Sequence, residues 1–189
     1  MKKFLLSAAM LMAVVLGVNA QNFEKGDMTL GGMVNLGASL NKNNNSFSYS
    51  LRPEFNYYIL EHFAVGVCGE IYRTGGKDKN ADPKVKNREL SFALCPQVSY
   101  EIPFGERWGF SNTLSLAVEW SKGKTIVDNV TTKGDLANAV SLYYYPGVYC
   151  FMNDNWFFDL GAGVLGYDFN ADTFNIGVYD LYFGLHYRF

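Results

Sequence analysis

Cysteine and histidine are scarce in this sequence, and their spacing excludes the common zinc sites. Among 189 residues there are three cysteines and two histidines, namely Cys68, Cys95, Cys150, His62 and His186. Zinc sites usually place pairs of such ligands a few residues apart, and no two of these cysteines are close in the sequence. We therefore expect no metal ion and no disulfide framework. One cross-strand disulfide, between Cys68 and Cys95, is left open.

Long apolar runs are absent after residue 20, and neither sign of charge is in large excess. A membrane-spanning helix needs about 20 apolar residues, so the sequence after residue 20 predicts none. The chain has 16 Lys and Arg against 18 Asp and Glu, and the only charged residues among the first 20 are Lys2 and Lys3. Residues 21–189 therefore carry 14 basic and 18 acidic side chains, a net charge of −4. This mildly acidic balance does not suggest a nucleic-acid partner.

The first 20 residues have the pattern of a secretory signal peptide. Two lysines precede an almost wholly apolar run from residue 4 to residue 18. The run ends at a site with small or modest side chains, so we expect cleavage between Ala20 and Gln21. The predicted organisation is a removed signal peptide at 1–20 and one domain at 21–189.

Apolar and polar residues alternate through the rest of the chain, which is typical of strands with two different faces. We count eight such segments, at 27–40, 46–59, 63–73, 88–102, 107–120, 137–151, 155–168 and 174–189. Tight turns alternate with longer connections, which lie at 41–45, 74–87 and 121–136. This arrangement is typical of an up-and-down meander. An even number of strands allows the last segment to pair with the first.

One face of the predicted strands is bulky and apolar, whereas the other face is mostly small. Eight strands leave an interior just wide enough to be filled by side chains, so we expect the small face inside. No lysine after residue 20 lies in the middle of a predicted strand, as expected for a wall that faces lipid. A soluble, lipocalin-like barrel would carry lysines along its outer face. The sequence therefore predicts an all-β fold, an eight-stranded antiparallel up-and-down transmembrane β-barrel.

Aromatic residues gather near the strand ends, where membrane barrels have girdles at the two interfaces. We assign this role to Tyr57, Tyr100, Trp108, Trp120 and Trp156. Three prolines recur at one level of alternate strands, at Pro53, Pro96 and Pro146. Because proline cannot donate to a ladder, we expect a bulge or a missing hydrogen bond at each, although the sequence gives no reason for the repeat.

The end of the chain resembles the C-terminal assembly signal of bacterial outer-membrane proteins. Its apolar residues alternate up to a terminal phenylalanine, and they include Phe183, Leu185, Tyr187 and Phe189. Residues 21–189 as a whole resemble the small outer-membrane β-barrel domain family, which includes OmpX-like and OmpW-like porin-family proteins and the barrel half of OmpA. The resemblance implies a Gram-negative outer membrane, contact with its lipids including lipopolysaccharide, and recognition by the outer-membrane assembly machinery.

Polar residues on the small face predict a network inside the barrel. Its members are Arg52, Glu54, Glu70, Glu101, Glu119, Asp159, Asp180, His186 and Arg188. Arg52 and Glu70 lie at nearly equal distances from the turn at 60–62, so we expect them to pair across neighbouring strands. The network either fills the interior as a rigid plug or lines a narrow polar path.

The predicted function is a closed or nearly closed outer-membrane barrel that presents extracellular loops for structural or surface-interaction roles. A narrow channel for ions or small solutes, hydrophobic ones included, is the alternative. Lysines outnumber acids in the predicted loops 74–87 and 121–136, which favours contact with lipopolysaccharide phosphates. No other extracellular partner can be identified from the sequence.

We expect neither a cofactor nor an enzymatic activity. The stretch GAGVLG at 161–166 matches a dinucleotide-binding motif, but no helical pattern follows it. The lipid A palmitoyltransferases are membrane barrels with a His–Asp–Ser set at the loop end. Here His62 falls in a short turn and His186 near the periplasmic end, so no such catalytic set is predicted.

Overall fold

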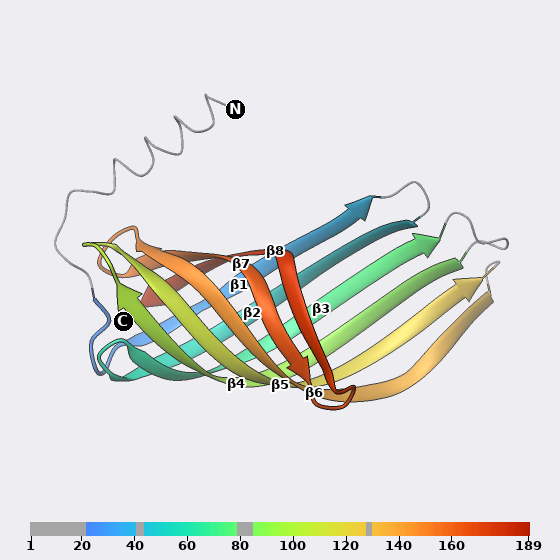
Figure 1. Cartoon of the computed structure of the whole chain (residues 1–189), viewed down its shortest axis with the longest axis horizontal. Helices are drawn as coiled ribbons and strands as arrows, with labels where there is room; N and C mark the ends of the chain where they lie inside the picture. The colour runs from blue at the N-terminus through green and yellow to red at the C-terminus, as the bar shows by residue number, and fades with distance from the viewer. Residues whose placement is uncertain (1–21, 41–43, 79–84, 128–129) are drawn as a thin grey trace, which may run out of the picture.

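Eight antiparallel strands close into a barrel in the computed structural model, which describes residues 22–40, 44–78, 85–127 and 130–189 (Figure 1). The strands are β1 (Met28–Leu40), β2 (Asn44–Leu60), β3 (Phe63–Asp78), β4 (Val85–Pro103), β5 (Trp108–Val127), β6 (Val130–Phe151), β7 (Trp156–Asp168) and β8 (Thr173–Arg188). The predicted eight-stranded up-and-down barrel is confirmed. The predicted cleavage site between Ala20 and Gln21 lies outside the described residues. Within the described part of the chain, no helix is long and apolar enough to cross a membrane.

The C-terminal strand closes the barrel against β1, as the even strand number predicts. Their ladder runs from the pair Thr29 and Arg188 to the pair Asn35 and Tyr182. Beyond it, Met28 and Phe189 exchange two backbone hydrogen bonds of 3.0 Å each. The last residue of the chain is therefore part of the seam that removes both sheet edges.

Side chains alternate between the outside and the inside of the barrel wall. On β8, Phe183 and Leu185 are 49% and 42% exposed, whereas Tyr182 and His186 are 5% and 2% exposed. The apolar residues therefore form the outer surface and polar residues lie within, the reverse of the arrangement in a soluble protein. This is the pattern of a barrel whose wall faces lipid.

The expectation that bulky residues stay outside is wrong for part of the interior. Aromatic rings from β6 and β8 point inwards, and glycines on neighbouring strands make room for them. A Cβ at Gly109 would collide with the ring of Tyr149, and one at Gly161 would collide with Tyr182. Some of the glycines on the inner face therefore leave space for large rings. The interior is filled because large side chains pack against small residues on neighbouring strands.

Two of the predicted long loops are mostly strand. The segments 74–87 and 121–136 extend the ladders β3–β4 and β5–β6, and 79–84 and 128–129 lie outside the described residues. Beyond the membrane both faces of a strand meet water, so a paired ladder there does not need alternation of apolar and polar residues. The barrel therefore has a turn end, with the short connections after β2, β4 and β6, and an opposite far end with long strand extensions (Figure 1).

The three prolines interrupt the ladders as expected. The β2–β3 ladder lacks pairs between Leu51 and Glu54, around Pro53, and the β4–β5 ladder lacks pairs around Pro96. The β6–β7 ladder shifts register beside Pro146. In an antiparallel ladder a residue directs its N–H and C=O to the same neighbour, so each proline weakens pairing on one side only. The ladders on the other side are continuous, as between Gly32 and Pro53.

Candidate functional site

A buried polar network fills the interior towards the turn end. His186 on β8 lies between two carboxylates, with Nδ1 3.5 Å from Glu54 and Nε2 3.4 Å from Asp159. Glu54 also accepts hydrogen bonds of 3.3 Å from Asn56 and from Gln97. All five side chains are buried. We call this set, together with Arg52, the polar plug.

Arg52 forms the boundary of the polar plug on the side that faces the far end of the barrel. Its Nε donates to Cys68 Sγ at 2.9 Å and its Nη2 donates to Gln97 Oε1 at 2.7 Å. The guanidinium carbon lies 4.1 Å from the ring centroid of Tyr145. The predicted ion pair between Arg52 and Glu70 is not formed. The β2–β3 ladder is interrupted beside Pro53, and the guanidinium bonds to Gln97 of β4 instead.

An aromatic cluster lies between the polar plug and the turn end of the barrel. Phe23, which precedes the first strand, is fully buried and stacks on Tyr58 with ring centroids 4.5 Å apart. Its other ring neighbours, at 5.1 to 5.2 Å, are Tyr149, Phe151 and Phe157. The segment is held by backbone bonds, since His62 N donates to Phe23 O and Gly26 N donates to Tyr58 O. We call these five rings the aromatic plug.

Little space is left within the polar plug. The cavity among its side chains has a volume of about 20 Å³, which leaves room for about one water molecule. Glu101 lines this cavity and is also buried, with no hydrogen-bond partner for its Oε2 among the described residues. The turn end of the barrel is therefore packed rather than open.

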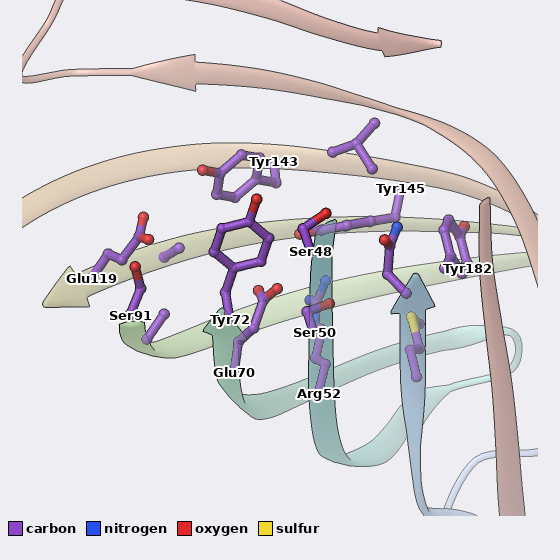
Figure 2. A pocket seen from close by; sticks show the side chains of 15 residues that line it. Ser48, Ser50, Arg52, Glu70, Tyr72, Ser91, Glu119, Tyr143, Tyr145 and Tyr182 are labelled. Carbon is purple, nitrogen blue, oxygen red and sulfur yellow. The ribbon is translucent and has the colours of Figure 1, made fainter. Parts of the chain in front are cut away.

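The interior contains a larger cavity between Arg52 and the far end of the barrel. A cavity of about 270 Å³, which we call the vestibule, extends from Arg52 towards the far end of the barrel. Figure 2 shows Glu70, Tyr72, Glu119 and Tyr143 around it, with Arg52 below. The predicted inner-face carboxylates with described side chains form two groups. Glu54, Glu101 and Asp159 line the small cavity of the plug, and Glu70 and Glu119 line the vestibule.

Two predicted interior residues remain, Arg188 and Asp180. Arg188 lies at the rim of the turn end, where Nη1 donates to Asn22 O at 2.7 Å and lies 3.6 Å from Asp27 Oδ2. The side chain of Asp180 lies outside the described part of the structure. The side chains assigned to the girdles lie at or near strand ends or, for Trp120, beside the extension of β5, and four of them are exposed: Tyr57, Tyr100, Trp120 and Trp156. Trp108 is partly buried and packs against Phe158.

Cys68 and Cys95 face one another directly in the β3–β4 ladder. Both are buried free thiols in the structure, and Cys68 accepts the hydrogen bond from Arg52. The predicted cross-strand proximity is confirmed, whereas the disulfide is not formed in this state. Within the described residues, no group of three or more His, Cys, Asp or Glu side chains could hold a metal ion.

A closed barrel with an apolar outer wall, a polar interior and short turns at one end defines an integral membrane β-barrel protein. Residues 6–189 match the family described as outer membrane protein beta-barrel domain. The chain belongs to this family, which confirms the resemblance and implies the outer membrane of a Gram-negative bacterium. In such barrels the short turns are periplasmic, so the far end is extracellular. No curated protein matches the chain.

Comparison with solved structures finds outer-membrane proteins that are similar to this chain at low sequence identity. Ail, the attachment invasion locus protein of Yersinia pestis, is 17% identical over 88% of this chain and 100% of that chain, with a TM-score of 0.51. OprG from Pseudomonas aeruginosa is 14% identical over 90% of this chain and 99% of that chain, with a TM-score of 0.49. The structural similarity to Ail shows a common fold and nothing about a common ligand.

Sequence reasoning missed two kinds of residue in the plugs. Asn56 and Gln97 lie at strand positions whose side chains point inwards, so the alternation could have included them. They were left out because the predicted network was chosen from charged side chains, and an amide is neutral. Phe23 precedes the first strand, where no alternation exists. Its insertion depends on the space between four rings from β2, β6 and β7, which only the closed barrel creates.

Proposed function

We propose that the protein is a closed, non-enzymatic outer-membrane barrel whose role lies at the extracellular surface. The observation that carries this proposal is the packed periplasmic half of the interior. The polar plug and the aromatic plug leave a cavity of only about 20 Å³ between them and the wall. Transport through the barrel would require these buried groups to separate and lose their hydrogen bonds. The narrow channel, the alternative for this fold, therefore has weaker support.

The surface that we propose to be functional is a basic belt on the strand extensions. Its members are exposed and lie on the extracellular side of Trp120: Arg73, Lys77, Lys86, Arg88, Lys122, Lys124 and Lys133. Several are direct cross-strand partners, since Lys77 pairs with Lys86 and Lys124 pairs with both Arg88 and Lys133. Like charges placed opposite one another destabilise a sheet unless an anion lies between them. None of the seven forms an ion pair within the described residues.

Phosphate groups of lipopolysaccharide are the anions that best fit the position of the basic belt. Because the belt begins just beyond Trp120, which we assign to the interfacial girdle, we infer that it lies near the level of the outer-leaflet phosphates. Arg73 and Arg88 share a surface hollow of about 290 Å³ with Phe47 and Tyr49. Paired cations beside exposed rings suit a lipid that has phosphates next to acyl chains.

The lipid-binding part of the proposal is tested by replacing Arg73 and Arg88 together with glutamine. Each basic residue near an anionic lipid surface contributes about 1 kcal/mol, so we expect at least a tenfold loss of affinity for lipopolysaccharide vesicles. The matched control changes Lys25 and Arg107 at the periplasmic end to glutamine and should bind as the unmodified protein does. Equal binding by both double variants, measured by co-sedimentation at several salt concentrations, would reject lipid recognition by the belt.

We also propose that the assembly machinery recognises the C-terminal strand. Phe183, Leu185, Tyr187 and Phe189 all face outwards and are exposed, which supports their role as an alternating assembly signal. The same strand forms the seam with β1, so recognition must occur before the barrel closes.

A further inference from the structure

The vestibule has a buried cation at its base whose charge is not matched by an ion pair. Arg52 is 3% exposed, and no carboxylate lies within salt-bridge distance of it among the described residues. Its Nε and Nη2 are used by Cys68 and Gln97, but its buried Nη1 has no hydrogen-bond partner. A buried guanidinium N–H without an acceptor is costly, and Arg52 lines the vestibule. An anionic group in the vestibule would supply the acceptor.

The walls of the vestibule carry the opposite charge. Glu70 on β3 and Glu119 on β5 both line it (Figure 2). Tyr72 and Tyr143 also line the vestibule and provide aromatic faces and hydroxyl groups. A ligand that enters from the extracellular side therefore meets negative charge on the walls and positive charge at the base.

The size of the vestibule fits a small molecule. Its volume of about 270 Å³ is close to the lower end of the roughly 300–1,000 Å³ typical of small-molecule sites. The polar plug closes the periplasmic side of the vestibule at Arg52. The vestibule is therefore a pocket with one opening rather than a segment of a channel. A ligand there would bind and leave by the same opening.

We propose that the vestibule is a binding site for a small zwitterion. The ligand carboxylate accepts a hydrogen bond from Nη1 of Arg52, and the ligand ammonium group lies between the carboxylates of Glu70 and Glu119. A ligand with only a carboxylate would face the two wall carboxylates, and a ligand with only an ammonium group would leave Nη1 without an acceptor. This site does not depend on the basic belt, which lies on the outer face of the wall.

Calorimetric titration of the refolded protein with ω-amino acids of increasing length tests the proposal. Glycine, 4-aminobutyrate and 6-aminohexanoate vary the separation of the two charges, while butyrate and butylammonium carry one charge each. We expect one of the zwitterions to bind at least tenfold more tightly than both single-charge compounds. No measurable binding of any zwitterion, or equal affinity for butylammonium, would overturn the proposal.

Variants of the two charged positions complete the test. We expect Arg52→Met to abolish the preference for the zwitterion over butylammonium and Glu70→Gln to weaken zwitterion binding by at least fivefold. Because Arg52 also belongs to the polar plug, Glu70→Gln keeps the proposal testable if Arg52→Met fails to fold. Glu106→Gln, in a periplasmic turn, is the matched control and should bind like the unmodified protein. Unchanged zwitterion affinity in Glu70→Gln would contradict the site.

Discussion

Replacing Gly31 with alanine is expected to prevent most of the refolded protein from closing its barrel. Gly31 lies on β1 in the seam with β8, opposite His186. An added Cβ would collide with the backbone oxygen of Leu185 and would lie 2.7 Å from the Cα of His186. Backbone atoms of a closed seam cannot move aside as a flexible side chain can. The strain therefore acts directly on the pairing that completes the barrel.

The fraction of closed barrel can be measured by electrophoresis without heating, because a closed membrane barrel resists unfolding by detergent. The matched control is Gly69→Ala on β3, where an added Cβ would meet no atom within 4 Å. We expect the control to close as the unmodified protein does. If Gly31→Ala closed as fully as Gly69→Ala, the close packing described for the seam would be wrong.

Replacing Phe23 with alanine is expected to lower the free energy of unfolding by about 3 kcal/mol. Removal of a buried phenylalanine side chain costs roughly 3–5 kcal/mol. The value should fall at the lower end of this range, because an end segment can detach and so limit the loss. Phe23 is fully buried against Tyr58 and three further rings, so its removal opens the aromatic plug.

Urea-induced unfolding from lipid vesicles, followed by tryptophan fluorescence, measures this loss. Phe174→Ala provides the matched control, since Phe174 on β8 is 62% exposed and contributes little packing. We expect the control to change the free energy of unfolding by less than 1 kcal/mol. Equal stability of the two variants would show that the N-terminal segment does not hold the periplasmic end closed.

The barrel wall was predictable because lipid imposes one rule on every strand within the membrane. Apolar side chains must point outwards there, so alternation gives the strand number, the faces and the seam between β1 and β8. This rule does not apply beyond the membrane boundary, so the strand extensions there were not predicted. The segments at 74–87 and 121–136 are mostly polar and lack the alternation, and their pairing depends on backbone hydrogen bonds that composition does not reveal.

The interior was predictable only in part. Alternation along a strand shows which side chains point inwards, but it does not show which of these side chains contact one another. Arg52 and Glu70 are at matching positions of β2 and β3, yet Arg52 reaches Gln97 on β4 and the ring of Tyr145. The curvature of the wall decides such contacts across the interior. The placement of Phe23 depends on it as well, since its ring neighbours come from three strands.

Single-channel recording of the refolded protein that begins at Gln21, in a planar lipid bilayer, tests the central claim most directly. If the polar and aromatic plugs fill the periplasmic half, the protein inserts and produces no steady unitary current. Phe23→Ala, recorded under the same conditions, shows whether loosening the aromatic plug alone opens a path. A steady unitary conductance from the unmodified protein would contradict the closed barrel and favour the narrow channel.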